Sequence, residues 1–245
     1  MHKTAIKDYV ESLGSGVFLP RLISGIKYFA ILIITILAFA GNANGQSIGD
    51  FGSAGVGPAN WSAPGSWVVC VSNGTWAGAT PAVIVPTAAT NVWILAGNTI
   101  TMDANPGSCN NLDVAGNLNY TGASAVTLNV SGNLSGAGTL NMSGGAQLHT
   151  LNLGGATNSI GTFTTAAVGS TVNYNAGGNQ TIFASANYRN LTTSVSGTKS
   201  LIGNTIVNNN LVVGAGYFDL GTIANTFTVL GSATLTGIFY FNDQC

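Results

Sequence analysis

The sequence predicts an all-β protein: a right-handed parallel β-helix, or β-solenoid, with an irregular N-terminal cap and a helical signal segment before it. Three observations support this prediction. Only 13 of the 245 residues are charged, about 5% where ordinary soluble domains carry about 25%. Gly supplies 34 residues and Asn and Thr 27 each, and all three are poor helix formers. Short runs of alternating apolar and polar residues recur along the chain, as strands require.

The first 45 residues have the features of a signal peptide. Basic residues precede an uncharged apolar run at 28–40, and Ala43-Asn44-Gly45 offers a small-x-small cleavage site. The run is shorter than the roughly 20 residues that span a bilayer. We therefore expect export, with a mature chain that begins near Gln46 and no membrane insertion of that chain. An uncleaved signal anchor is the alternative.

Residues 46–82 are predicted to form a cap rich in Trp and Gly. Trp61, Trp67 and Trp76 stand among Gly, Pro and Ser residues. Large aromatic side chains in such a segment can cover the open end of a repetitive β-structure and hide its strand edges. The same three side chains are candidates for a platform that contacts glycans.

Residues 83–245 are predicted to form the solenoid repeats and to be cut short at the C-terminus, where Cys245 follows an apolar segment. Strand-and-turn units are expected at 91–103, 110–120, 125–134, 138–146, 149–156, 170–178, 208–216 and 225–237. Alternation turns Leu112, Val114, Leu128 and Val130 to one side of their strands, and Asn129 to the other.

The spacing of these units favours stacked coils. Leu112-Asp-Val-Ala-Gly-Asn-Leu118 matches Leu128-Asn-Val-Ser-Gly-Asn-Leu134, and such units form the faces of coils of roughly 20 residues that bury their apolar side against neighbouring coils. We expect seven to nine coils, roughly one per 4.8 Å, with Gly and Asn at corners where φ is positive. An antiparallel β-sandwich is the rival architecture.

These motifs support a resemblance. The segment 74–103, followed by the two matched units, resembles the N-terminal part of large secreted surface proteins of Bacteroidetes-type bacteria, which are adhesin-like β-solenoids. It is more distantly similar to the glycine-rich domain named for eight glycines. The resemblance covers residues 60–240 and carries no catalytic residues. It implies a longer protein that ends in a C-terminal sorting domain.

Cysteine usage fits an exported chain. Cys70 and Cys109 are the predicted disulfide pair. In the chain-entropy model, closing the loop between them would stabilise the folded state by about 3–4 kcal/mol. Two buried thiols are the alternative. Cys245 is left unpaired, and its role is open.

Residues suited to catalysis or metal binding are scarce. The acids after residue 45 are Asp50, Asp103, Asp113, Asp219 and Asp243, and His149 is isolated. Only Asp103 and Asp113 are candidates for a pair on adjacent coils, as a polysaccharide lyase or hydrolase would need. We predict no catalytic, metal-binding or cofactor-binding residues, and thus no enzyme.

Threonine pairs recur at Thr99/Thr101, Thr162/Thr164, Thr226/Thr228 and Thr234/Thr236. In register on one flat face they would form a hydroxyl array able to bind ice or a crystalline polysaccharide. Because Thr is also simply favoured in strands, the pairs by themselves are weak evidence for such a face.

The sequence therefore predicts a non-enzymatic structural or adhesion module that is secreted or displayed on the cell surface. A polar Asn/Thr/Ser face would make weak, multivalent contacts with polysaccharide or extracellular matrix. Two Lys/Arg against five Asp/Glu after residue 45 leave no basic field to attract nucleic acid. The alternative is a carbohydrate-active β-helix whose catalytic part lies outside this chain or is unrecognised.

Overall fold

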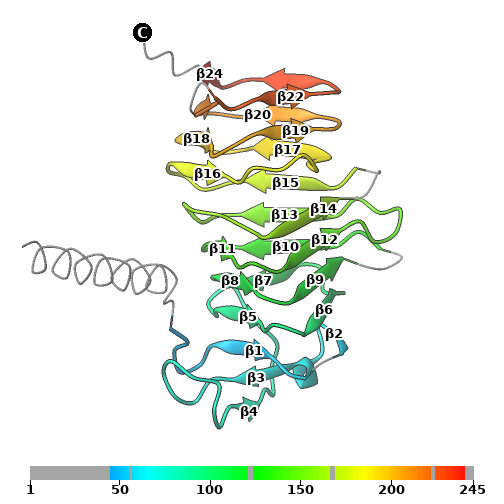
Figure 1. Cartoon of the computed structure of the whole chain (residues 1–245), viewed down its shortest axis with the longest axis vertical. Helices are drawn as coiled ribbons and strands as arrows, with labels where there is room; N and C mark the ends of the chain where they lie inside the picture. Colours follow the sequence, from blue (N-terminus) through cyan, green and yellow to red (C-terminus); the bar gives the residue numbers. More distant parts are fainter. Residues whose placement is uncertain (1–44, 56, 121–123, 166–168, 222–223, 241–245) are drawn as a thin grey trace, which may run out of the picture. The chain divides into compact units, whose positions relative to one another are not determined.

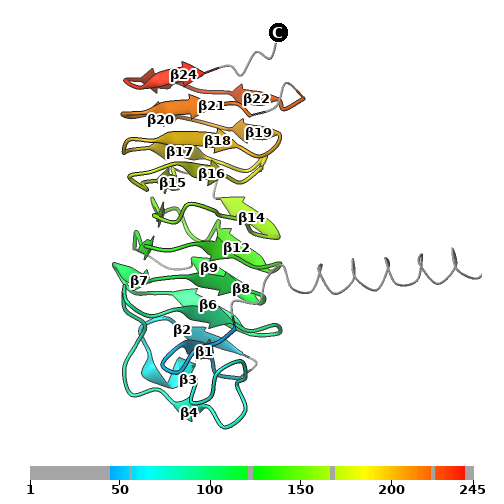
Figure 2. The same ribbon diagram turned by 90° about the vertical axis from the view of Figure 1, so that its left-hand side faces the viewer.

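The computed structural model describes residues 45–55, 57–120, 124–165, 169–221 and 224–240. Residues 1–44 of the predicted signal segment lie outside the described residues. Residues 46–245 form one compact unit, and its described part is a parallel β-solenoid, as predicted. Figures 1 and 2 show its coils stacked from the cap (blue) to the last coil (red). No described helix is long and apolar enough to cross a membrane.

The first face of the solenoid begins as a six-stranded sheet. Its parallel strands are β1 (Phe51–Ser53), β5 (Val92–Ile94), β8 (Leu112–Val114) and β11 (Leu134–Ser135), and two antiparallel strands, β3 (Trp67–Val69) and β4 (Thr80–Pro81), extend it at the capped end. The face continues as β16 (Gln180–Ile182), β18 (Thr198–Leu201), β21 (Tyr217–Asp219) and β24 (Ile238–Tyr240). Residues 156–159 join the two sheets, because the amide of Ser159 donates to Leu134 and that of Thr181 donates to Ala156.

The second face is a five-stranded parallel sheet of β2 (Pro58–Asn60), β6 (Thr99–Met102), β9 (Asn117–Tyr120), β12 (Thr139–Met142) and β14 (Thr162–Thr165). Further along the stack, β19 (Thr205–Val207) pairs with β22 (Phe227–Val229).

The third face is the longest sheet. Its seven parallel strands are β7 (Gly107–Cys109), β10 (Thr127–Val130), β13 (Thr150–Leu153), β15 (Thr171–Tyr174), β17 (Asn190–Thr193), β20 (Leu211–Val213) and β23 (Ala233–Leu235). Each strand belongs to one coil, so the described chain makes seven coils on this face, within the predicted range.

The coil length also agrees with the prediction. Val92 pairs with Leu112 of the next coil, and Thr127 pairs with Thr150, which are the intervals expected of coils of roughly 20 residues. The matched units of the sequence, at Leu112 and Leu128, are two faces of the same coil, β8 and β10. A repeat that looks irregular along the chain is therefore regular in space.

Alternation places the apolar side chains inside, as predicted. Leu112, Val114, Leu128 and Val130 are at most 1% exposed, whereas Asn129, between two of them, is partly exposed. The core is one continuous column of such side chains, stacked coil upon coil.

Positive φ angles occur only at glycines in the described part of the chain, so the expectation that Asn shares this role is wrong. Gly136 has φ +118°, and a Cβ there would overlap the carbonyl of Val114 in the coil below. Asn side chains act differently: Oδ1 of Asn111 accepts the backbone N–H of Asn133 in the next coil at 2.8 Å.

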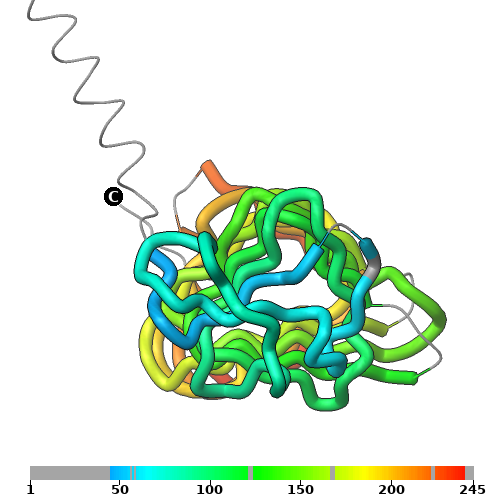
Figure 3. Tube along the Cα trace, turned by 90° about the horizontal axis from the view of Figure 1, so that it is seen from below, coloured from blue at the N-terminus to red at the C-terminus, as the bar shows by residue number. Residues whose placement is uncertain are grey.

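The cap begins later than predicted. β1 and β2 already pair in parallel with β5 and β6, so the solenoid starts at Phe51, inside the segment assigned to the cap. The covering residues are β3, β4 and the 3-10 turn η1 (Pro64–Ser66), and Figure 3 shows this part of the chain crossing the end of the coiled tube.

Truncation of one inward side chain in the middle of the stack tests this architecture. Leu151 of β13 is fully buried, and Leu151→Ala is expected to lower the free energy of unfolding by about 2–5 kcal/mol. The matched control is its outward neighbour, Thr150→Ala, with an expected loss below about 1 kcal/mol. Urea unfolding followed by circular dichroism measures both. Equal losses would contradict the assignment of inward and outward positions.

Candidate functional surface: the outward Asn and Thr columns

The outward side of the third face carries two polar columns. In-register pairing of four successive strands, β10, β13, β15 and β17, aligns one residue from each strand per column. The first column is Thr127, Thr150, Thr171 and Asn190, and the second is Asn129, Asn152, Asn173 and Thr192. Successive members stand about 4.8 Å apart, the spacing of paired strands. All of them are partly exposed.

Hydrogen bonds between side chains hold the second column in order. Nδ2 of Asn152 donates to Oδ1 of Asn129 at 2.8 Å, and Nδ2 of Asn173 donates to Oδ1 of Asn152 at 3.0 Å. The amides are thus oriented by one another, so little side-chain entropy remains to be lost on binding a ligand. The surface is both polar and preorganised.

The second face carries a further pair of four-residue columns on β6, β9, β12 and β14. These columns are Thr99, Asn117, Thr139 and Thr162, and Thr101, Asn119, Asn141 and Thr164. In the second of them, Thr164 donates its hydroxyl to Oδ1 of Asn141 at 2.9 Å.

The threonine pairs of the sequence are divided between faces. Thr99/Thr101 and Thr162/Thr164 share the second face, and the interval between them corresponds to three coil steps filled by Asn and Thr. Thr228 lies on β22 of this face, whereas Thr234 lies on β23 of the third face. The four pairs therefore do not form one array, but two of them bound a continuous polar surface.

The two candidate catalytic acids are not brought together. Asp103 follows β6, and its carboxylate accepts hydrogen bonds from the amide and hydroxyl of Ser62. Asp113 lies on β8 of the first face and accepts the hydroxyl of Ser135 at 2.9 Å. The two residues are on adjacent coils, as expected, but on different sides of the solenoid, so one substrate bond cannot lie between them.

His149 is a core residue. It is fully buried, its Nδ1 accepts the amide of Val126 at 3.3 Å, and its Nε2 lies 2.8 Å from the carbonyl of Gly144. Its ring packs edge-on against Tyr120. Both ring nitrogens have backbone partners, which suits a structural imidazole.

The tryptophans of the cap divide into two roles. Trp61 and Trp67 are 1% and 0% exposed, their rings pack edge-to-face at 5.1 Å, and Nε1 of Trp67 donates to the carbonyl of Trp61. They fill the end of the core, so their proposed glycan contact is corrected. Trp76 is partly exposed and packs against Trp93 instead.

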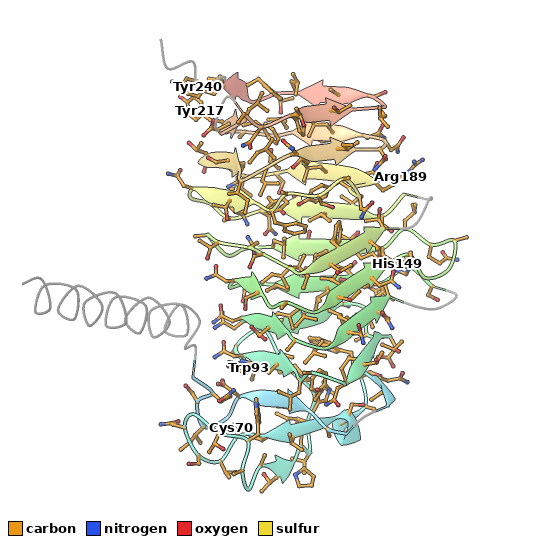
Figure 4. The ribbon with its side chains drawn as sticks, viewed as in Figure 1. Cys70, Trp93, His149, Arg189, Tyr217 and Tyr240 are labelled. Carbon is orange, nitrogen blue, oxygen red and sulfur yellow. The ribbon has the colours of Figure 1, made fainter. Side chains whose placement is uncertain are left out.

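The predicted disulfide is also corrected. Cys70 and Cys109 are free, buried thiols. Cys70, at the capped end in Figure 4, has Sγ 3.1 Å from the carbonyl of Ser72. Cys109 points into the core from β7 on the third face, where burial raises its thiol pKa. The two positions belong to different sides of the solenoid.

Alkylation distinguishes these alternatives. In a Cys245→Ser chain without reductant, iodoacetamide is expected to leave Cys70 and Cys109 unmodified while the protein is folded, because burial excludes the reagent from both thiols. Burial also disfavours the thiolate of Cys109. Both should react after unfolding, as read by peptide mass. A requirement for reductant would establish a disulfide instead.

A buried lysine closes one inner corner. Lys199 is 1% exposed, and its Nζ donates to the carbonyls of Ala176, Gly178 and Ser196 at 2.7, 2.8 and 3.0 Å. Lys199 stacks in register on Gln180. Nε2 of Gln180 donates hydrogen bonds to the carbonyls of Leu153 and Gly155 one coil below. These polar side chains satisfy turn carbonyls that face inward. Composition gave no sign of this role.

Lys199 gives the stability of the fold a pH dependence. Burial lowers its pKa from the ordinary 10.5, so the unfolded chain binds more protons between the folded pKa and 10.5, and the free energy of unfolding should rise with pH there. Lys199→Met should remove this rise and cost about 1–3 kcal/mol by leaving three carbonyls without a donor.

Urea unfolding of the wild type and of Lys199→Met at each pH isolates the contribution of Lys199 to the free energy of unfolding. Burial raises the pKa of Tyr120, Tyr174 and Tyr188, and their contribution is lost in both proteins as pH rises above about 10. Parallel pH profiles for the wild type and Lys199→Met would contradict the assignment.

Within the described residues, no group of three or more His, Cys, Asp or Glu side chains is placed to hold a metal ion. Comparisons of the chain with family models, curated proteins and solved structures found no match.

Proposed function

We propose that this chain is a non-enzymatic structural or adhesion module, exported to the cell surface, whose Asn and Thr columns make weak, repeated contacts with neutral glycans or matrix. The observation that carries the proposal is the pair of in-register polar columns on the third face. A ligand with regularly spaced hydroxyl groups can contact several rungs at once, and many weak contacts then add to useful avidity.

The charge distribution supports a neutral ligand. The eight column residues of the third face are uncharged, so an acidic or basic polymer would gain no Coulomb attraction from them. Hydroxyl and amide groups both donate and accept hydrogen bonds, which matches the mixed donors and acceptors of sugar hydroxyls. Export and surface display rest on the apolar run at 28–40 and on the resemblance to secreted surface proteins.

Isosteric loss of hydroxyls from one column tests the proposal. The triple variant Thr127→Val/Thr150→Val/Thr171→Val keeps the shape and strand preference of the column. Three lost hydrogen bonds, at about 0.5–1.5 kcal/mol each, predict at least a tenfold weaker binding to insoluble neutral polysaccharides, measured by depletion from solution. Thr80→Val on the exposed strand β4 of the cap is the control for the loss of a hydroxyl outside the columns.

Two results would contradict the proposal. Unchanged binding of the triple variant would exclude the column as the contact surface. Soluble reducing ends that accumulate with time, and that are lost on Asp103→Asn or Asp113→Asn, would instead support a carbohydrate-active enzyme.

A further inference from the structure

Two places on the first face repeat the same arrangement of three side chains. At one end, Trp93, Asp113 and Ser135 lie directly beside one another on β5, β8 and β11. Further along the stack, Ser200, Asp219 and Tyr240 lie beside one another on β18, β21 and β24. Each group is a single outward column of an aromatic ring, a carboxylate and a hydroxyl, in opposite order along the solenoid axis. We call them the Trp93 triad and the Tyr240 triad.

In the Trp93 triad, the serine orients the carboxylate. The hydroxyl of Ser135 donates to Oδ2 of Asp113 at 2.9 Å, which is the only hydrogen bond of that carboxylate within the described part of the chain. Trp93 is joined by Trp76, with ring centroids 5.9 Å apart and planes at 67°. A glycine makes room for this pair, because a Cβ on Gly52 would lie 2.8 Å from the Trp76 ring.

The Tyr240 triad has the same features. The hydroxyl of Ser200 donates to Oδ2 of Asp219 at 3.1 Å, and the amide of Gly221 donates to its Oδ1 at 2.9 Å. Tyr240 lies beside Asp219 on the neighbouring strand. Tyr217, two residues before Asp219, is the diagonal neighbour of Tyr240, and side chains as long as tyrosine can meet at such a diagonal. The two rings are 51% and 48% exposed, and Figure 4 shows them next to each other at one edge of the stack.

Both triads point away from the core on one side of the molecule. The segment 156–159 continues the backbone ladder from β11 to β16, so the first face is unbroken between them. Thr181 is an outward residue of the stretch between the triads, and the triad residue next to this stretch is a serine in both cases, Ser135 and Ser200. A ligand that runs along the solenoid axis would thus meet an aromatic ring near each end and polar, uncharged groups between.

The chemistry of each triad suits a sugar ring. A partly exposed aromatic face offers apolar area to the C–H side of a ring at a low entropic cost. A carboxylate held by one serine keeps lone pairs that accept hydrogen bonds from hydroxyl groups, and such charge-assisted bonds are the stronger kind. Aromatic rings can also bind cations. Two partly exposed rings beside one carboxylate lack the enclosed, desolvated aromatic cage from which cation binding gains most.

We propose that the Trp93 and Tyr240 triads are two subsites for one neutral glycan chain, with Trp76, Trp93, Tyr217 and Tyr240 as stacking platforms and Asp113 and Asp219 as hydroxyl acceptors. The inference rests on the proposed function, because it names the glycan-binding residues of the same module. It differs in placing the principal contacts on the first face, and the polar columns of the third face then add further weak contacts.

The test uses the full chain and soluble neutral hexasaccharides of glucose, N-acetylglucosamine, xylose and mannose, with affinity measured by calorimetry. Trp93→Ala and Tyr240→Ala are each expected to weaken binding of the recognised hexasaccharide at least fivefold. Trp93→Tyr and Tyr240→Phe, which keep the ring, should restore most of it. Asp113→Asn and Asp219→Asn should each weaken it at least threefold. Unfolding curves verify that every variant is folded.

Controls separate this inference from the proposed function. The Thr127→Val/Thr150→Val/Thr171→Val variant should lose less affinity for the soluble hexasaccharide than Trp93→Ala or Tyr240→Ala does, because it removes only the weaker contacts of the third face. Binding that is lost in this variant and kept in Trp93→Ala and Tyr240→Ala would overturn the triads while supporting the polar columns. A wild type that binds none of the four hexasaccharides at millimolar concentration, or that binds tetramethylammonium in their place, would overturn the inference outright.

Discussion

The structure depends on one constraint, the in-register parallel pairing of each coil with the next. Backbone hydrogen bonds between coils fix which residues lie above one another, so Thr127 meets Thr150 and Asn129 meets Asn152. Because alternation along a strand is strict, a shift of one residue would turn every apolar side chain outward. Burial of the core and order on the surface therefore have the same cause. The same strand pairing aligns the polar columns on the outside and stacks the leucines on the inside.

A stack of this kind creates two difficulties, at its corners and at its end. Turn carbonyls that face inward need donors, which Gln180 and Lys199 supply from inside the solenoid. Corners that approach the coil below exclude a side chain, which explains Gly136. The first coil would expose its core, and the buried side chains of Trp61 and of Trp67, the first residue of the antiparallel strand β3, fill that end. The buried polar side chains, the corner glycine and the two buried tryptophans thus satisfy carbonyls, avoid clashes and cover the core where the repeat alone would not.

The scarcity of charge connects the fold to the proposed activity. Outward residues in a solenoid repeat at the strand spacing, so like charges in a column would repel one another at about 4.8 Å. Asn and Thr avoid this repulsion, and Asn adds hydrogen bonds along the column. The surface that is stable in this architecture is consequently one that suits neutral, hydroxyl-rich ligands. Against this background, the two carboxylates of the first face stand out because each lies beside a partly exposed aromatic ring.

The sequence by itself determined the fold class, the coil length and the direction of the alternating side chains, because these follow from local propensity and a period of two. It also identified the strand units that begin at Leu112 and Leu128, which form two faces of one coil. Only the tertiary structure decided which residues meet, since that depends on the length of each corner and on pairing between successive coils. It separated Asp103 from Asp113, kept Cys70 from Cys109, and buried Trp61 and Trp67 while leaving Trp76 at the surface. For the same reason the triads could not be found in advance: Trp93, Asp113 and Ser135 come from three successive coils, and nothing but the register of those coils places them side by side.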